Sequence, residues 1–281
     1  MNPSRHALDQ HFAEPPWAMF QTLLEDETRR RHIFPRLQVL AYESIKSTND
    51  ICMGMAQKGD RGPLVVLANH QSAGRGRQGS QWNSAANCNL LLSLLLEISG
   101  AGHDLLALAV SLAAVDAIER TAQSLPMECR VKWPNDILLA GRKVAGILIE
   151  KPAATGSDLA VIGIGINVNQ SSFPPELAQQ AVSLAMACGG EVSRLTLATE
   201  LLAGLQRWLS PLPDKNLVAA QWKARCDMLG QRVSVECGGT LIHGLVADVD
   251  PFDGLVLRQD NGVLRVCHAA TSRTVRCAPA T

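Results

Sequence analysis

The sequence predicts a mixed α+β fold followed by a small, separate all-β module. Three observations lead to this prediction. Apolar runs of strand length alternate with helical periodicities through the middle of the chain. From Gly230 onward the pattern changes to short segments of strand length, several linked by glycine-containing turns. The 281 residues also suffice for one large domain with a substantial core plus a second, smaller unit.

The first 36 residues form a compositional block of their own. Apolar residues that follow Pro15 and Pro16 can line one face of a short helix, and three arginines, residues 29–31, stand where positive charge complements the helix dipole. Acidic residues 25–27 directly precede these arginines, so binding of nucleic acid is the less favoured interpretation. We expect residues 1–36 to be a helical arm that docks on the chain or forms an interface. A winged helix would need about 60 residues to build even a marginal core.

The central block, residues 37–229, alternates helices and strands. Ser47 or Thr48 can cap the first helix, and Gly59 can end it. Tight turns join three successive strands in the middle of the block. The predicted helices are residues 47–58, 105–125, 194–209 and 216–229. The predicted strands are residues 64–68, 89–97, 130–133, 137–140, 144–150 and 159–168.

The C-terminal block, residues 230–281, is predicted to be an SH3-like β-barrel. Its expected strands are residues 232–235, 240–246, 254–258 and 263–267. Pairs of turn residues, at 238–239, 253–254 and 261–262, separate these segments.

The amino-acid composition excludes several classes of function. The chain has 26 Lys and Arg against 26 Asp and Glu, so no large electrostatic footprint for nucleic acid or an anionic membrane is expected. No stretch is apolar for the roughly 18 residues that a membrane span needs, and the N-terminal residues lack an apolar signal core. The eight cysteines are scattered without a Cys-x-x-Cys pair, which argues against a zinc ribbon or a redox motif. We therefore expect a cytoplasmic protein that binds neither DNA nor membranes.

The run from Gly74 to Gly79, which reads Gly-Arg-Gly-Arg-Gln-Gly, is the most informative stretch. Glycines let the backbone wrap a ligand closely, and the two arginines offer forks for a carboxylate and a phosphate. Trp82, just behind the run, supplies a flat apolar face and an indole donor. Lys132, followed at once by a Trp-Pro-Asn-Asp turn, adds positive charge far downstream. Together these motifs predict a site that brings two anions together.

A carboxylate and a nucleotide α-phosphate repel each other, so joining them requires positive charge in a site that excludes water. The carboxylate is already ionised, and no general base is needed. Arg75, Arg77 and Lys132 are the right residue types for this work. We expect the glycine-rich loop, residues 74–82, to be partly disordered without ligand and to order over a reactive intermediate.

These motifs, together with residues 47–49, 143–150 and 163–167, resemble in order and spacing those of biotin protein ligases. The resemblance covers roughly residues 37–277. It implies a catalytic domain with a mixed sheet, of the class II synthetase-like biotin/lipoate ligase type, and an SH3-like C-terminal domain. It also implies a reaction in which biotin and ATP, with Mg²⁺, give biotinyl-5′-adenylate and pyrophosphate. The biotinyl group would then pass to one lysine of a biotin carboxyl carrier protein, a subunit or domain of a biotin-dependent carboxylase.

Carried over residue by residue, the resemblance implies the site. The biotin contacts would be Ser47, Thr48, Asn49, Gln71, Arg75, Gly76, Arg77, Lys132 and Gly146. The ATP contacts would be Arg75, Trp82, Asn89, Lys132 and Asn167. Lys132 and Arg77 would be catalytic, with Lys132 bridging the biotin carboxylate and the phosphate. Asp136 could help to hold Mg²⁺, although a turn role is favoured. Gln78 departs from the family pattern, in which many members carry a further basic residue.

Other functions stay open as alternatives. A lipoate or octanoate ligase would share the fold, but its glycine-rich arginine motif and histidine-containing loop are not found here. A biotin-responsive transcriptional repressor would need a DNA-binding domain, so a ligase without one is expected. The sequence leaves open the identity of the carrier and the oligomeric state, including a homodimer formed through edge strands.

Overall fold

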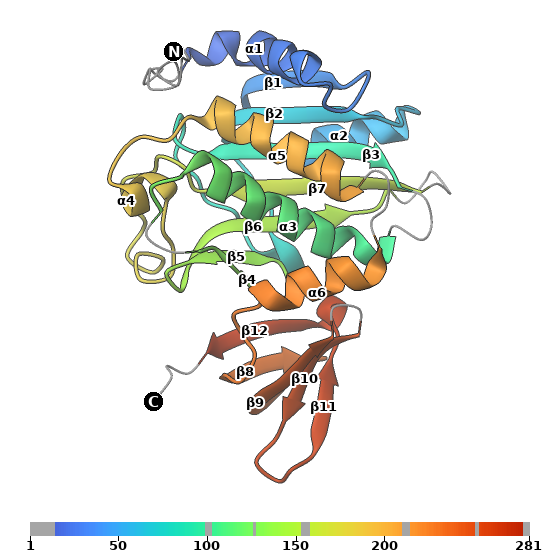
Figure 1. Cartoon of the computed structure of the whole chain (residues 1–281), viewed down its shortest axis with the longest axis vertical. Helices are drawn as coiled ribbons and strands as arrows, with labels where there is room; N and C mark the ends of the chain where they lie inside the picture. Colours follow the sequence, from blue (N-terminus) through green and yellow to red (C-terminus); the bar gives the residue numbers. More distant parts are fainter. Residues whose placement is uncertain are drawn as a thin grey trace, which may run out of the picture.

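The computed structural model describes residues 15–98, 103–125, 128–152, 158–209, 214–250 and 253–277. These residues form a large mixed sheet with helices on both faces, and a smaller antiparallel sheet near the C-terminus (Figure 1). The predicted mixed α+β fold is therefore confirmed, and the second sheet is consistent with an SH3-like domain. Residues 1–14 of the expected N-terminal arm lie outside the described residues.

The large sheet has seven strands in the order β1-β2-β3-β7-β6-β5-β4. Its strands are β1 (Gln38–Ile45), β2 (Leu64–Gln71), β3 (Leu90–Glu97), β4 (Arg130–Lys132), β5 (Asp136–Leu139), β6 (Arg142–Glu150) and β7 (Leu159–Ile166). The β1–β2 pair is parallel and the other pairs are antiparallel. The central strands are apolar over most of their length because helices cover both faces.

The helices divide between the two faces of this sheet. They are α1 (Trp17–Arg30), α2 (Thr48–Gln57), α3 (His103–Thr121), α4 (Leu184–Cys188), α5 (Arg194–Leu209) and α6 (Lys215–Arg225). In Figure 1, α3 and α5 lie across the near face and α2 lies behind the sheet. Each face has its own apolar core, and the larger core is the one beneath α3 and α5.

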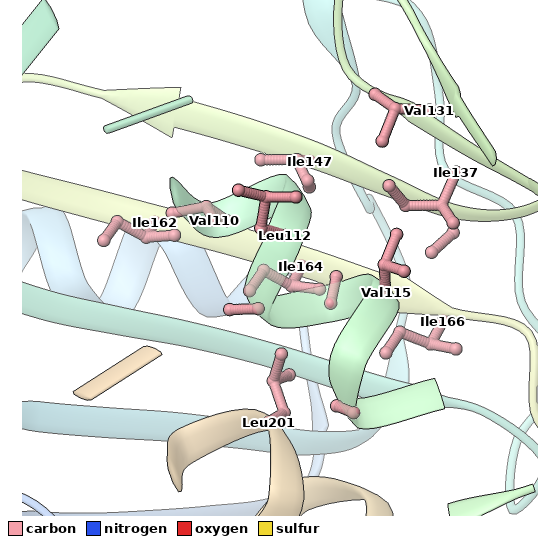
Figure 2. Packing of buried hydrophobic residues seen from close by; sticks show 14 of the residues in the cluster. Val110, Leu112, Val115, Val131, Ile137, Ile147, Ile162, Ile164, Ile166 and Leu201 are labelled. Carbon is pink, nitrogen blue, oxygen red and sulfur yellow. The ribbon is translucent and has the colours of Figure 1, made fainter. Parts of the chain in front are cut away.

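The alternation of side chains along β7 separates the core from the functional face. Ile162, Ile164 and Ile166 pack against Val110, Leu112 and Val115 of α3 (Figure 2). Successive side chains of a strand point to opposite faces, so Gly163 and Gly165 face the α2 side. One strand therefore supplies bulk to the core and open space to the opposite face.

The smaller sheet has five strands in the order β11-β10-β9-β8-β12, all antiparallel. They are β8 (Arg232–Cys237), β9 (Thr240–Asp250), β10 (Gly254–Arg258), β11 (Leu264–Cys267) and β12 (Ser272–Cys277). Val235, Val249 and Leu257 are among its buried apolar residues. Helix α6 lies between the two sheets (Figure 1), and Lys223 on it pairs with Asp248 of β9 at 3.0 Å.

Several elements differ from the sequence prediction. Strands β1 and β12 and the short helix α4 were not predicted, and α6 ends at Arg225 rather than at residue 229. Strand β1 has one buried residue and otherwise half-buried or exposed ones, so its sequence lacks both a continuous apolar run and a clean alternation. No helix in the described part of the chain is long and apolar enough to cross a membrane.

Candidate active site

A cavity of about 410 Å³ opens on the α2 side of the large sheet. The glycine positions of β6 and β7 form its floor, and the start of α2 forms one wall. The glycine-arginine loop, residues 74–82, lies over it, and the β4–β5 turn, residues 133–136, closes another side. Segments far apart in sequence therefore meet here, as the motifs predict.

The floor of the cavity requires glycine. Gly146 and Gly165 are register partners on adjacent strands. A Cβ atom at Gly165 would lie 2.5 Å from Cε2 of Trp82, and one at Gly146 would lie 2.9 Å from its Cζ3. The indole of Trp82 thus lies directly against the backbone of β6 and β7. Its Nε1 is buried without a hydrogen-bond partner among the described residues, which leaves a donor for a ligand.

The wall at the start of α2 is polar and buried. Ser47, Thr48 and Asn49 are each at most 4% exposed. Gln71 Oε1 accepts hydrogen bonds from the amide N of Thr48 at 2.7 Å and from its hydroxyl at 3.0 Å. Ser93, on β3 below, has its Oγ 2.7 Å from Thr48 Oγ1. The structure therefore brings the predicted residues 47–49 and Gln71 into one pocket that can pair with a polar, uncharged ligand group.

The glycine-arginine loop folds back on itself. Gly76 N donates to Ser80 O at 2.7 Å, and Trp82 N donates to Gly74 O at 3.0 Å. A Cβ atom at Gly74 would lie 2.6 Å from the carbonyl oxygen of Trp82, so this return requires glycine. Gln78 occupies the left-handed region at a φ of 51°. Its Nε2 donates to Ser272 O of the smaller sheet at 3.5 Å.

Positive charge enters the cavity from two directions. Lys143, on β6, lies 2.7 Å from Asp136 Oδ1 and 5.4 Å from the ring centroid of Trp82. Arg77 donates from Nη1 to Asn135 Oδ1 at 3.4 Å and from Nη2 to the carbonyl oxygen of Ala269. Burial lowers the pKa of Arg77, and the charge of Asp136 opposes that shift. Lys143 and Asp136 therefore meet beside the tryptophan, and Arg77 lies close enough to Asp136 to be affected by its charge.

Lys143 is a residue that the sequence reasoning did not assign to the site. A β-bulge between β5 and β6 explains why: Ile137 pairs with Ala145, whereas Leu138 pairs with Lys143, so Val144 is the extra residue. Strict alternation from Gly146, which faces the cavity, would direct residue 143 away from it. The bulge returns Lys143 to the cavity side, and its place in the motif of residues 143–150 was the available signal.

Three predicted site residues do not line the cavity. The lining runs from Trp133 to Asp136 and does not include Lys132. Lys132 lies on β4 at the edge of the sheet, near Asp227. Burial raises the pKa of Asp227, while the charges of Arg130 and Lys132 oppose that shift. Of these two lysines, Lys143 lines the cavity and Lys132 does not.

Asn89 and Asn167 are buried amides that hold the segment after β7. Asn89 Oδ1 accepts from Val168 N at 3.0 Å, and its Nδ2 donates to Gln170 Oε1 at 2.7 Å. Asn167 Nδ2 donates to Val182 O at 3.2 Å. Both side chains are thus engaged with protein groups rather than directed at the cavity.

Arg75 lines the cavity, as expected. Its guanidinium pairs with two carboxylates, those of Glu150 at the end of β6 and of Asp50 in α2. The predicted fork for a ligand anion is therefore closed by protein carboxylates in this structure.

The described residues contain no group of three or more His, Cys, Asp or Glu side chains that could hold a metal. Asp136 is the carboxylate nearest to Lys143 in the cavity. A single carboxylate suits a Mg²⁺ ion that arrives with nucleotide phosphates, because Mg²⁺ in such sites keeps waters and takes one or two protein carboxylates. The residues present thus fit a cation that is shared with a nucleotide substrate.

Comparisons with known proteins all lead to ligases of biotin or lipoate. The sequence model of the Biotin/lipoate A/B protein ligase family matches residues 41–169. The biotin--[acetyl-CoA-carboxylase] ligase of Mycobacterium tuberculosis is 34% identical over 220 residues, covering 75% of this chain and 79% of that protein. The corresponding ligase of Paracoccus denitrificans is 32% identical and covers 77% of this chain and 92% of that protein. The bifunctional ligase/repressor BirA of Escherichia coli is 31% identical, with 79% of this chain and 69% of that protein covered.

A solved structure supports the same fold. The biotin protein ligase of Aquifex aeolicus in complex with biotin and ATP superposes with a TM-score of 0.72. It is 23% identical, and the match covers 85% of this chain and 99% of that one.

Proposed function

The chain belongs to the family of biotin protein ligases, and from that premise we propose that its cavity activates biotin with ATP and transfers it to a lysine of a carrier protein. The observation that carries this proposal is the meeting of Lys143, Arg77 and Asp136 between a buried polar pocket and the indole of Trp82. Two relatives that are 34% and 32% identical to this chain are named as biotin--[acetyl-CoA-carboxylase] ligases.

The two ends of the cavity suit the two substrates. The bicyclic end of biotin carries a ureido group, whose N–H groups and carbonyl need acceptors and donors. Residues 47–49 and Gln71 supply such groups in a buried setting. Trp82 offers its ring face and an unpartnered Nε1 to the adenine. In this orientation the biotin carboxylate and the α-phosphate would lie next to Lys143 and Arg77.

The chemistry follows from charge and position. A carboxylate oxygen of biotin bonds to the α-phosphorus of ATP, and the bond from that phosphorus to the bridging oxygen breaks to release pyrophosphate. Lys143 and Arg77 offset the repulsion of the two anions, and they stay protonated throughout. In the second step the uncharged amine of a carrier lysine attacks the acyl carbon. AMP leaves, and the amine proton passes to solvent.

Mg²⁺ is part of this proposal. Asp136 would hold it beside the nucleotide, and the ion would neutralise phosphate charge. Asp136 would otherwise keep Lys143 oriented through the 2.7 Å ion pair.

We assign residues to the two substrates according to their place in the cavity lining. We assign biotin contacts to residues 47–49, Gln71 and the backbone of residues 74–77, and nucleotide contacts to Trp82 and Lys143. Lys143 takes the charge-bridging role expected of Lys132. Asn89 and Asn167 support the site through the backbone after β7.

The remaining parts of the proposal concern organisation and partners. We assign residues 1–36 to an N-terminal extension, residues 37–229 to the catalytic domain and residues 230–281 to the C-terminal domain. The acceptor would be the carrier of a biotin-dependent carboxylase in the cytoplasm. A ligase role without DNA binding is proposed, and a gel shift with candidate operator DNA and biotinyl-adenylate would reveal a repressor.

A transfer assay tests the proposal. The protein is incubated with ATP, Mg²⁺, biotin and a biotin carrier domain, and the carrier is analysed by mass spectrometry. We expect one biotinyl group on one lysine, and a Lys→Arg carrier serves as the control. An unmodified carrier together with consumption of ATP would mean that the acceptor is of another kind.

A further inference from the structure

Arg75 ties three elements together beside the cavity. Its Nη1 and Nη2 donate to Oε1 and Oε2 of Glu150 at 2.9 and 2.8 Å, a bidentate pair. Its Nη2 also lies 2.8 Å from Oδ1 of Asp50. The start of the glycine-arginine loop is thereby fixed to the end of β6 and to the first turn of α2.

Glu150 has a second, buried partner. Its Oε2 accepts a hydrogen bond from Nδ2 of Asn49 at 2.7 Å. Oδ1 of Asn49 in turn accepts from the hydroxyl of Ser93. An ionised carboxylate can only accept, so Glu150 determines which end of the Asn49 amide faces it and which end faces the interior. A Cβ atom at Gly163 would lie 2.3 Å from Oδ1 of Asn49, so no larger residue fits beneath this amide.

The charges decide what Arg75 can do. One guanidinium faces two carboxylates, so the cluster of Arg75, Asp50 and Glu150 has a net charge of −1. An incoming anion gains little from a cation that is already paired in this way. The group of Arg77, Lys143 and Asp136 has instead a net charge of +1, so it can attract the anions of the substrates.

From these contacts we propose that Glu150 is a positioning residue of the ligase reaction, which straps the glycine-arginine loop over the biotin pocket through Arg75 and orients the Asn49 amide inside it. Arg75 thus acts through the loop and not as a ligand for substrate phosphate. The proposal rests on the proposed function, because the pocket concerned is the one assigned to biotin.

The geometry separates this cluster from an ordinary surface ion pair. The pair of Arg61 and Glu97 has side chains 51% and 52% exposed and joins the edge of a loop to the end of β3. Exposed pairs of that kind contribute little. The side chain of Glu150 is 25% exposed and has three bonds, one of them to an amide that is 3% exposed. Glu97→Gln is therefore a matched control for Glu150→Gln.

The first test needs no substrate. Trypsin cleaves after arginine, and Arg75 and Arg77 both lie in the loop. For Glu150→Gln we expect tryptic cleavage in residues 74–82 to be roughly tenfold faster than in the wild type, because losing charge-assisted bonds shifts a local opening equilibrium by about that factor. Glu97→Gln should match the wild type. Asp50→Asn, at a half-exposed position, gives a second variant that leaves β6 intact and should also speed cleavage. Unchanged cleavage in both variants would contradict the proposal that Glu150 holds the loop over the pocket through Arg75.

The second test separates positioning from folding. In biotin-dependent ATP–pyrophosphate exchange, Glu150→Gln should raise the KM for biotin about tenfold while kcat at saturating biotin changes less than threefold. Arg75→Gln should do the same, and the double variant should be no worse than either single variant. A lower kcat with an unchanged KM for biotin would mean that the variant merely contains less folded enzyme, and Glu150 would then have only a structural role. If the wild type shows no exchange with biotin yet the cleavage result holds, the strap stands and the proposed function fails.

Discussion

The ammonium of Lys143 is held in place by protein groups on the cavity side of β6. Its ammonium lies 2.7 Å from Asp136 and 5.4 Å from the ring centroid of Trp82, so it is oriented before a substrate arrives. A preoriented cation needs little reorganisation when two anions meet beside it, and this favours the transition state over the ground state. Lys132, on the other side of the β4–β5 turn, is outside the cavity lining.

The first prediction compares these two lysines. Lys143→Ala should lower the rate of biotin-adenylate formation by about 100-fold or more, because an electrostatic donor at the reacting centre is lost. Lys132→Ala, the matched control, should stay within about threefold of the wild type. Exchange rates are measured together with thermal unfolding, so that loss of fold is excluded. A larger loss in Lys132→Ala than in Lys143→Ala would return the bridging role to Lys132.

The residues of the polar pocket could be predicted from the sequence, whereas the cations could be predicted only in part. Residues 47–49 lie at one helix start, so their grouping is local. The side on which Lys143 lies depends on the extra residue Val144 in the β5–β6 pairing. Such a register shift arises from tertiary packing and leaves no periodic signal. The resemblance pointed to Lys132, whereas the lysine that lines this cavity is Lys143.

At the scale of elements, the strongly periodic segments were the predictable ones. Helix α5 and strand β10 have the predicted bounds, residues 194–209 and 254–258. Strand β1 was missed because it lies at the edge of the sheet, where all but one of its residues are half-buried or exposed. Its identity as a strand comes from pairing with β2, a contact between segments that no local pattern records.

The glycine-arginine loop carries the second prediction. Its internal hydrogen bonds and the strap at Arg75 hold it closed, but its residues 78–81 are exposed. Ligand contacts from Arg77 and Trp82 should hold it more firmly, because they add bonds to the closed form alone. We expect biotinyl-adenylate to slow tryptic cleavage in residues 74–82, with cleavage elsewhere as the internal control. Equal cleavage with and without biotinyl-adenylate would contradict a closing loop.

Helix α1 covers the free edge of β1. Gln21 Oε1 accepts from the amide of Ala41 at 3.1 Å, and Nε1 of Trp17 donates to the carbonyl oxygen of Tyr42 at 3.1 Å. The ring of Trp17 also lies 5.3 Å from the guanidinium carbon of Arg194. An uncovered edge strand is a template for pairing with another chain. The helix therefore protects this edge and makes a dimer formed by extension of the sheet at β1 unfavourable.

The third prediction follows from this cover. The double variant Trp17→Ala, Gln21→Ala should weaken the docking of α1 and increase self-association, measured by light scattering after size-exclusion chromatography over a range of concentrations. Met19→Ala, at an exposed position of the same helix, is the control and should behave as the wild type. A double variant with unchanged association would show that the edge needs no cover.

For the whole molecule, the buried thiols link stability to pH. Burial raises the pKa of Cys52 and of Cys129 to about 12, from 9.0 for an exposed thiol. In the unfolded chain these thiols ionise near pH 9, whereas in the folded chain they stay protonated. Ionisation therefore favours the unfolded chain above pH 9, and the stability that burial of the neutral thiols provides is lost from there toward pH 12.

The fourth prediction is measured as the free energy of unfolding in urea between pH 7 and pH 10.5. It should be flat with respect to these groups below pH 9 and should fall above it. Cys52→Ala and Cys129→Ala should each reduce the slope above pH 9, whatever their effect at pH 7. Slopes that match the wild type in both variants would mean that these thiols ionise in the folded chain.

The glycine-arginine loop connects the two parts of the molecule, because its Arg77 and Gln78 donate hydrogen bonds to Ala269 and Ser272 of the smaller unit. We propose above all that ATP activates biotin in the cavity of the larger sheet. The direct measurement is exchange of labelled pyrophosphate into ATP by the purified protein, with biotin, lipoate and octanoate in parallel and Lys143→Ala as the control. We predict exchange that depends on biotin alone and is lost in Lys143→Ala. Exchange with lipoate or octanoate instead, or with no acid at all, would contradict a biotin ligase.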